Sequence, residues 1–422
     1  MHRSKREWLS RTGALALAMG LGLGGWLAPV AHAQQPIKIG IGIAQTGTLG
    51  GGGKAALLAL QMWVEDVNAK GGLLGRKVEL ISYDDQSSAA TTPGIYTKLL
   101  DVDKVDLLIA PYGTVPTAPI MPLVKQRELL LMGNFSFQVN HTVKHDMWFN
   151  NAPWGDATSW TEGFLQIGQK IGAKTIAFIA ADQEFAQNLA NGAKDVAKKT
   201  DLKTVYEQNY PPTTVDFSSM IRAIRAAQPD MVFICSYPND SVALVRAINE
   251  IGVGSSVKLI GGGMVGLQFT PIMENLGSSL NGIVNYTSYA PGMQYPGIED
   301  FLKRYAQKAA EAKVDPLGFY LPPFNYAIGQ ILEQAVTATK SLDSKTLAKY
   351  MHSHEFNTIV GSISWGPDGE RAKPAVPMIQ FRNLVDKNVE QFRGPGKQVI
   401  LYPPQFKSGD PIVPYDKART AK

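Results

Sequence analysis

The 422-residue chain contains a single cysteine, Cys235. One thiol cannot form an intramolecular disulfide, so core packing alone must stabilise the fold. Cys235 also lies far from the N-terminus, which excludes a lipid-modified cysteine behind an export signal. The sequence therefore predicts an unanchored protein without disulfides.

Net charge is small as well. The chain has 41 lysines and arginines against 36 acidic residues, a formal net charge of +5. Residues 1–33 hold four of the basic side chains and one acidic one, so the net charge of the remainder is only +2. Nucleic-acid-binding proteins carry basic surfaces, and this chain has no such excess. We therefore expect no nucleic-acid partner.

Long apolar runs are absent beyond the N-terminus. A basic start is followed by the apolar run GALALAMGLGLGGWLAPV, and AHA then supplies a small-x-small cleavage pattern. This order predicts a signal peptide over 1–33 and a periplasmic location. The stretch SKREWLS resembles a twin-arginine signal with lysine for the first arginine, so Sec and twin-arginine export both remain open. Without a second apolar segment we expect no membrane anchor.

Recognisable catalytic and metal-binding patterns are also missing. The sequence has no G-x-S-x-G elbow. His141 and His145 are four residues apart but have no third ligand nearby, and His352 and His354 stand equally alone, whereas zinc sites need three or four ligands. We therefore expect no catalytic residues, no metal and no cofactor. For the pair Asp84–Asp85, a turn and helix-cap role is favoured over acid–base chemistry.

The stretch TGTLGGGGKAAL, residues 46–57, looks at first like a phosphate-binding loop. Thr48 occupies the position of the first required glycine, and Ala55 replaces the hydroxyl that holds magnesium. A tight turn between a strand and a helix explains the glycines equally well. The glycines also leave space near Gly52 that a ring-bearing ligand is expected to use.

A second glycine pattern occurs in LIGGGMVG. Gly261, Gly263 and Gly266 match G-x-G-x-x-G after a predicted strand. Pro271, however, is expected to interrupt the helix that should follow, and no acidic residue stands about 20 residues on to hold a ribose. A flexible loop at a cleft is therefore favoured over dinucleotide binding.

What the sequence does contain is a regular alternation of short apolar strands and amphipathic helices. Such alternation predicts parallel sheets covered on both faces, and its two series predict two α/β lobes. The first series has strands at 36–44, 76–83, 105–110 and 129–134 and helices at 54–68, 92–100 and 115–127. The second has strands at 173–181, 203–208, 229–236 and 257–262 and helices at 185–199, 217–227 and 242–251. Residues 284–350 are predicted to be mostly helical, with late strands in GSISW and VPMIQF.

Aromatic residues gather where these strands are predicted to end. Ligands of open parallel sheets bind outside the carboxyl ends of the strands, so these residues are candidates for a cleft wall, although some must belong to the core. Phe135 and Phe137, which flank Ser136, are favoured as a ligand wall. The aromatic candidates are Tyr112, Phe135, Phe137, Trp154, Trp160, Phe185, Tyr237, Tyr286 and Tyr289.

These features accompany a family resemblance. The segment IKIGIGIAQTGTLGGGGKAALLALQMWVEDVNAKGGLLGRKVELISYDDQSS resembles the start of type I periplasmic solute-binding proteins, the leucine/isoleucine/valine-binding group of ABC importers. VDLLIAPYGT, YPPTTVDFSSMIRAIRAAQPDMVF and GSISWGPDGE continue the resemblance over essentially the whole chain after residue 33. It implies an α/β fold of two Rossmann-like lobes with parallel sheets, joined by a three-crossover hinge that closes on the ligand. The implied lobes are 34–153 plus 284–355 and 154–283 plus 356–405, with a C-terminal tail at 406–422.

The resemblance also implies a ligand site. In the family a Ser or Thr and backbone N–H groups of two first-lobe loops hold an amino acid's carboxylate, and PYGT and GNFSF match those loops. Tyr237 matches a tyrosine-containing loop of the second lobe, and Asp156 lies near another polar position. The glutamate usual after the strand matching VKLIGG is replaced by glycine. The predicted ligand-binding residues are Tyr112, Gly113, Thr114, Phe135, Ser136, Phe137, Trp154, Asp156, Phe185, Tyr237 and Gly263.

The resemblance thus implies that the carboxylate-binding loops are retained and that the acidic partner of the ligand's ammonium group is lost. Burying an ammonium group without a carboxylate partner costs several kcal/mol. The predicted ligand is therefore a carboxylate without an α-amino group. The expected ligand is an aromatic acid of the benzoate or hydroxycinnamate kind. Branched-chain amino acids, amides or urea, and a sensor module on the same fold remain alternatives. We expect a monomeric receptor, not an enzyme, that delivers its ligand to an inner-membrane ABC permease.

Overall fold

The structure is a computed structural model that describes residues 35–421, except for the side chain of Ala157. The predicted signal peptide, 1–33, lies outside the described residues. From Pro36 onward the chain forms one unit. Within the described range, no helix combines the length and the apolar character needed to cross a membrane.

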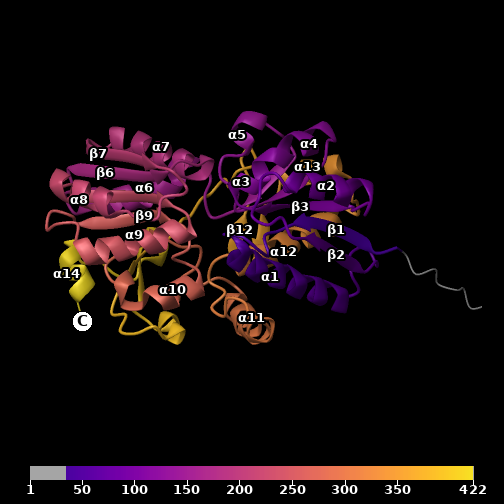
Figure 1. Ribbon diagram of the computed structural model, residues 1–422. Helices are drawn as coiled ribbons and strands as arrows, with labels where there is room; N and C mark the ends of the chain where they lie inside the picture. The colour runs from indigo at the N-terminus through magenta and orange to yellow at the C-terminus, as the bar shows by residue number, and fades with distance from the viewer. Residues whose placement is uncertain (1–34, 422) are drawn as a thin grey trace, which may run out of the picture. The chain divides into compact units, whose positions relative to one another are not determined.

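The first sheet of the described chain is parallel and has the strand order β2-β1-β3-β4-β5. We call this sheet with its helices the first lobe (Figure 1). Its strands are β1 (Ile37–Gly42), β2 (Val78–Tyr83), β3 (Leu107–Tyr112), β4 (Leu131–Asn134) and β5 (Trp148–Asn151). The helices that follow them in the chain are α1 (Gly50–Ala69), α2 (Thr92–Asp101), α3 (Thr114–Thr117), η1 (Ala118–Ile120), α4 (Met121–Gln126) and α5 (Asn140–Val143).

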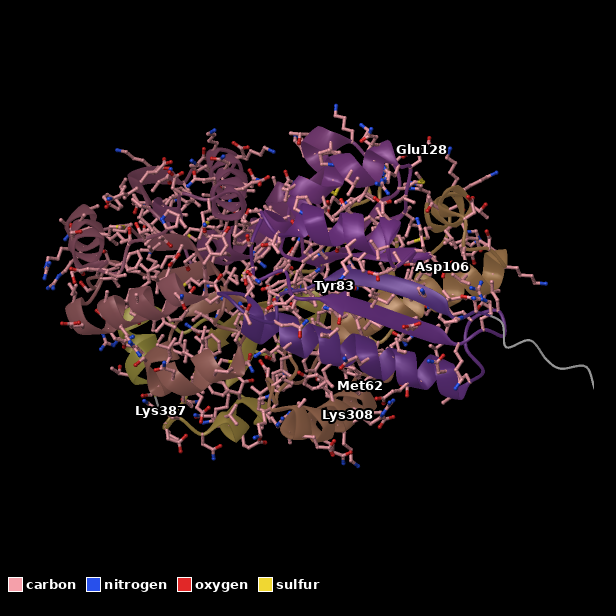
Figure 2. All side chains as sticks on the ribbon, turned by 45° about the vertical axis from the view of Figure 1, so that its right-hand side comes forward. Met62, Tyr83, Asp106, Glu128, Lys308 and Lys387 are labelled. Atoms are coloured by element: carbon pink, nitrogen blue, oxygen red, sulfur yellow. The ribbon has the colours of Figure 1, made fainter. Side chains whose placement is uncertain are left out.

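Three later helices return to the first lobe: α11 (Ile298–Ala312), α12 (Pro322–Thr339) and α13 (Ser344–Met351). Helix α12 packs along α1, where the Trp63 ring lies within 2.6 Å of where a Cβ on Gly329 would sit. Helix α11 is linked to α1 at the surface, where Lys308 pairs with Glu65 at 2.8 Å; Lys308 projects outwards while Met62 of α1 is buried (Figure 2).

The second sheet has the order β14-β13-β10-β9-β8-β6-β7 within the described residues. Strands β6 to β10 run parallel to one another, β13 is antiparallel to β10, and β14 is antiparallel to β13. We call it, with its helices, the second lobe. Its strands are β6 (Thr175–Ala181), β7 (Lys203–Tyr210), β8 (Met231–Ser236), β9 (Leu259–Met264), β10 (Val284–Tyr286), β13 (Met378–Phe381) and β14 (Gln398–Tyr402). Its helices are α6 (Ala157–Lys170), α7 (Glu184–Lys198), α8 (Ser218–Ala227), α9 (Pro238–Ile251), α10 (Thr270–Leu276), η2 (Gly277–Leu280), η3 (Val389–Arg393), η4 (Pro404–Phe406) and α14 (Tyr415–Thr420).

In the described chain three segments cross between the two sheets: 152–156 after β5, 287–297 after β10, and 364–377 before β13. The crossovers are bonded to one another. Ala375 N–H donates to the Pro153 carbonyl at 2.8 Å, and Thr287 N–H donates to the Pro377 carbonyl at 2.9 Å. The predicted fold class, two Rossmann-like lobes joined by three crossovers, is confirmed.

Sheet membership differs from the predicted lobe ranges at two places. Strand β10 pairs with β9 and β13 in the second sheet, although 284–355 was expected in the first lobe. The hairpin of β11 (Phe356–Thr358) and β12 (Gly361–Ile363), expected in the second lobe, is bonded to α12 instead: Gln334 Nε2 donates to the Asn357 carbonyl at 3.0 Å. The division of the chain into lobes is otherwise left as a prediction.

The glycine run is not a loop. Helix α1 begins at Gly50, so the four glycines form its first turns. A Cβ on Gly53 would lie 1.8 Å from the Ala44 carbonyl oxygen, so glycine there lets the helix approach β1 closely. The prediction of empty space near Gly52 is wrong. The side chains of Leu321, Phe269 and Tyr112 come within 3.0–3.2 Å of where a Cβ on Gly52 would be.

The interpretation of Pro271 as a helix breaker is also wrong. Pro271 lies in the first turn of α10, a position where a missing N–H costs nothing. The helix predicted over 115–127 is divided into α3, η1 and α4, and Pro116, Pro119 and Pro122 recur along it.

Candidate functional site

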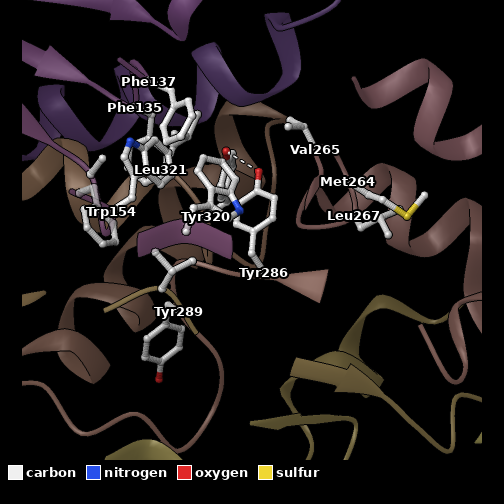
Figure 3. Packing of buried hydrophobic residues seen from close by; sticks show 14 of the residues in the cluster. Phe135, Phe137, Trp154, Met264, Val265, Leu267, Tyr286, Tyr289, Tyr320 and Leu321 are labelled. Atoms are coloured by element: carbon white, nitrogen blue, oxygen red, sulfur yellow. Dashed lines mark hydrogen bonds between the residues drawn. The ribbon is translucent and has the colours of Figure 1, made fainter. Parts of the chain in front are cut away.

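A small cavity lies where loops of the first lobe meet helix starts of the second. Its volume is about 40 Å³, and none of its lining side chains within the described chain is charged. Phe135, Trp154 and Tyr320 form part of its wall (Figure 3). The lining residues are Leu49, Tyr112, Gly113, Thr114, Val115, Phe135, Trp154, Trp160, Phe185, Tyr237, Val265 and Tyr320.

Thr114 supplies the polar group of the first-lobe wall. Gly113, with a φ of 93°, turns the chain after β3 so that Thr114 begins α3. The Thr114 Oγ1 accepts the Phe137 N–H at 2.9 Å, and no acceptor among the described residues takes its proton. The first N–H groups of a helix also have no intrahelical acceptor. The loop therefore offers a hydroxyl and backbone donors to an anion.

Ser136 and Phe137 lie behind this wall and do not line the cavity. The Ser136 hydroxyl is buried and donates to Thr117 Oγ1 at 2.8 Å. The Phe137 ring contacts the rings of Trp160 and Phe185, with centroids 5.4 and 6.0 Å apart. Both residues thus support the loops that carry Thr114 and Phe135.

Phe135 holds a strained place in the wall. Its φ of 56° lies in the left-handed region, which a bulky residue rarely adopts and which costs about 1–3 kcal/mol. Its ring meets Trp154 and Tyr320 edge-on at 4.9 and 5.2 Å, contacts that stabilise the conformation. Trp154 in turn stacks on Trp160, with centroids 4.1 Å apart.

Two donors in the cavity wall have no partner. The indole N–H of Trp160 and the phenol O–H of Tyr237 are buried and donate to no acceptor among the described residues. The backbone N–H of Phe185 lies close enough to the Tyr237 oxygen to lower its pKa, which leaves the phenol proton itself without an acceptor. Burial raises the pKa of Tyr237 above its usual range, and the charges of Glu184 and Asp240 add to the shift. Tyr237 is therefore a neutral phenol throughout the physiological range.

A chain of tyrosines continues the wall. The hydroxyls of Tyr286 and Tyr320 are 3.0 Å apart and hydrogen-bonded, as the dashed line in Figure 3 marks. Burial raises the pKa of Tyr112 as well, with the neighbouring Tyr320 contributing. Tyr289 lies apart and packs on Phe319.

Besides Ser136 and Phe137, two more predicted site residues do not line the cavity. Asp156 caps α6, where its carboxylate accepts the N–H groups of Thr158 and Ser159 at 3.1 and 2.9 Å. Gly263 lies within β9, and a Cβ there would meet the side chain of Leu189 at 2.6 Å, so this position faces the core of the second lobe. Seven predicted residues do line it: Tyr112, Gly113, Thr114, Phe135, Trp154, Phe185 and Tyr237.

Trp160, an aromatic candidate from the sequence, also lines the cavity. The remaining four lining residues were not expected from the sequence: Leu49, Val115, Val265 and Tyr320. Leu49 and Val265 lie within the two glycine-rich stretches, TGTLGGGGKAAL and LIGGGMVG, and Val115 directly follows PYGT. Tyr320 stands just before α12, far in the chain from any predicted strand end, so nothing in its local pattern indicated the site.

The pair Asp84–Asp85 organises a turn. Asp84 accepts the N–H groups of Gln45 and Gln86 at 2.8 and 2.9 Å, and Ser87 Oγ accepts that of Leu49 at 3.0 Å. Burial opposes ionisation of Asp84, but these bonds and that from Thr46 lower its pKa. The pair thus fixes the loop that presents Leu49 to the cavity.

A wider hollow of about 370 Å³ adjoins the cavity and shares Leu49, Val115 and Tyr237 with it. Asp240 lines this hollow, and its carboxylate accepts the Tyr210 hydroxyl at 3.2 Å. In the described chain no group of three or more His, Cys, Asp or Glu residues could hold a metal ion.

Comparisons with known proteins agree with this geometry. A family model described as "Periplasmic binding protein" matches residues 36–385. A curated relative, Leu/Ile/Val-binding protein homolog 7 of Brucella suis, is 26% identical over 365 residues, which are 82% of this chain and 88% of the relative.

Two solved structures show the same fold. One is the substrate-binding protein LivJ of a branched-chain amino acid transporter from Streptococcus pneumoniae, in complex with isoleucine: TM-score 0.70, 18% identity, 84% of this chain and 97% of that one covered. The other is a solute-binding protein of an ABC transporter from R. palustris in complex with benzoate: TM-score 0.69, 17% identity, 87% and 95% covered.

Proposed function

The chain belongs to the periplasmic binding protein family, the solute-binding components of ABC transporters, and from this premise we propose that its ligand is a small aromatic carboxylate such as a benzoate or a hydroxycinnamate. The family consists of binding proteins rather than enzymes. Delivery of the ligand to an inner-membrane permease, a periplasmic location and a monomeric state belong to the same proposal.

The observation that carries the proposal is the aromatic cavity without a charged side chain. An α-amino acid brings an ammonium group, and burying that charge without a carboxylate partner costs several kcal/mol. The aromatic side chains of Phe135, Trp154 and Trp160 instead offer ring edges and faces against which a planar ring packs once the lobes have separated.

The carboxylate is assigned to the first-lobe wall. The free proton of the Thr114 hydroxyl and the N–H groups at the start of α3 supply donors there. Ser136 supports these loops through Thr117. Such a set of neutral donors can hold one negative charge without a buried cation.

Binding requires the two lobes to separate. A cavity of about 40 Å³ holds little more than a water molecule or two, so an aromatic acid cannot enter it as it stands. The three bonded crossovers are the hinge about which the lobes open, and the adjoining hollow is the entry.

Branched-chain amino acids are the second candidate, because the Brucella relative is named for them and LivJ was solved with isoleucine. The Asp240 carboxylate in the adjoining hollow is the acidic group that an ammonium would have to reach. Amides or urea, and a sensor role, have no comparable observation in their favour.

A thermal-shift panel on the purified protein separates these candidates. The proposal predicts that benzoate, 4-hydroxybenzoate or a hydroxycinnamate raises the melting temperature and that leucine, isoleucine and valine do not. Stabilisation by the amino acids alone would overturn it. Release of unchanged ligand after unfolding would separate a receptor from an enzyme.

A further inference from the structure

We propose that Trp160 and Tyr237 form a donor pair on the second-lobe wall that binds a neutral ring oxygen of the ligand, so that ring-hydroxylated aromatic acids are preferred to unsubstituted ones. This inference rests on the proposed function, since it assumes an aromatic acid whose carboxylate is held by the opposite wall at Thr114.

The first argument is the unmet hydrogen-bonding capacity of the pair. Both residues line the cavity, both donor atoms are buried, and neither donor has an acceptor among the described residues. A buried donor without an acceptor is costly, and native structures leave few of them. An oxygen acceptor brought by the ligand would satisfy both.

The second argument is that the two donors belong to one continuous surface. Phe185 of α7 contacts both rings, with centroids 5.4 Å from Trp160 and 5.7 Å from Tyr237. The three side chains come from α6, the start of α7 and the residue before α9, all elements of the second lobe. A ligand held at Thr114 would therefore meet this pair across the cavity.

The charges around Tyr237 also favour a neutral acceptor at this end of the cavity. Glu184 and Asp240 act on Tyr237 through their negative charges, and no cationic side chain lines the cavity in the described chain. The same field disfavours a carboxylate at this end, whereas a phenol oxygen accepts hydrogen bonds without bringing a charge. The ligand's carboxylate and its ring oxygen are thus assigned to opposite walls.

The test is calorimetric titration of the full mature chain with benzoate and with 4-hydroxybenzoate, which differ only in the ring hydroxyl. Wild type should bind 4-hydroxybenzoate about tenfold more tightly or better. Tyr237→Phe and Trp160→Phe each remove one donor and should bring this ratio towards one, because affinity for 4-hydroxybenzoate falls more than affinity for benzoate. Tyr305→Phe is the matched control, because its buried hydroxyl also has no partner among residues 35–421 but lies on α11, away from the cavity.

The wild-type ratio tests the inference even where a variant fails to fold. A ratio near one, a ratio that both variants leave unchanged, or an equal loss for both acids would overturn the donor pair and leave the proposed function standing. If neither acid binds and leucine does, the proposed function falls, and this inference with it.

Discussion

The hydroxyls of Thr114 and Ser136 play different roles in the structure. From the sequence the two are equivalent, since each lies in a loop that matches a carboxylate-binding loop of the family. In the fold Thr114 lines the cavity and its hydroxyl proton has no acceptor within the described part of the chain, whereas the Ser136 hydroxyl donates to Thr117 Oγ1. The structure therefore favours Thr114 as the direct contact, with Ser136 as its support.

Thr114→Val should weaken binding of an aromatic acid by about 1–3 kcal/mol, because the carboxylate loses a hydrogen bond. Thr114→Ser keeps the hydroxyl and serves as the control. Titration calorimetry measures both, together with Ser136→Ala. A Ser136→Ala variant that loses more affinity than Thr114→Val would reverse the assignment of the two roles.

Much of the candidate site could be predicted from the sequence at this scale, because local signals mark it. Thr114, Phe135 and Tyr237 end strands in stretches that match the family, and all three line the cavity. Tyr320 reaches the cavity only through the return of the chain to the first lobe, which no local pattern records. Asp156 was misplaced because capping and ligand binding both use an acidic residue at a helix start.

At the scale of elements, tertiary packing decides which glycines of the run Gly50–Gly53 are required. Two positions in the first turn of α1, Gly51 and Gly53, differ sharply. A Cβ on Gly53 would overlap the carbonyl of Ala44, two residues after β1, whereas a Cβ on Gly51 meets nothing within 4 Å. The run therefore contains one glycine required by packing and one that is not.

Gly53→Ala should destabilise the protein by several kcal/mol, since α1 would have to move away from β1. Gly51→Ala, its matched control, should be neutral or stabilising by up to about 1 kcal/mol, because alanine favours the helix. Urea unfolding of the two variants makes the comparison. Equal stability of both would contradict the close approach of α1 to β1.

The alternation of strands and helices was predictable because each buried strand of a parallel sheet is a short apolar run. The exact starts of the helices were not predictable. Helix α1 starts four residues before the predicted helix. Its glycines are poor helix formers, so only tertiary contacts stabilise the helix there. Strand β10 is three residues long, too short for a period to show. Helix α6 and strand β5 were missed as well.

At the scale of the whole molecule, a buried carboxyl ties the third crossover to the first lobe. Glu370 accepts hydrogen bonds from Trp148 Nε1 at 3.2 Å and from Asn150 Nδ2 at 2.8 Å, both on β5. Burial raises its pKa to about 8; the two hydrogen bonds lower it, and the charge of Asp368 adds to the rise. The hinge thus contains a carboxylic acid that is mostly protonated at neutral pH.

This group should make stability fall as pH rises. Between the ordinary glutamate pKa and about 8, the folded chain holds a proton that the unfolded chain has lost, so unfolding releases a proton. The loss is at most about 1.4 kcal/mol per pH unit and ends above the folded pKa. Glu370→Gln should remove this slope, because an amide cannot ionise. Its NH₂ group replaces one of the two oxygens that accept hydrogen bonds from Trp148 and Asn150, so we also expect a loss of stability that is the same at every pH.

Urea unfolding from pH 5 to pH 8 checks this, with Glu274→Gln on the exposed side of α10 as the control. Relative to wild type, the Glu370→Gln variant should gain stability as pH rises, while the control follows wild type. Parallel curves for all three proteins would show that Glu370 ionises normally.

We propose that the cleft binds an aromatic carboxylate rather than an amino acid. Calorimetric titration of the mature protein with 4-hydroxybenzoate and with leucine tests this most directly. The account predicts saturable one-to-one binding of 4-hydroxybenzoate and no heat of binding for leucine. Saturable binding of leucine with none of 4-hydroxybenzoate would contradict it.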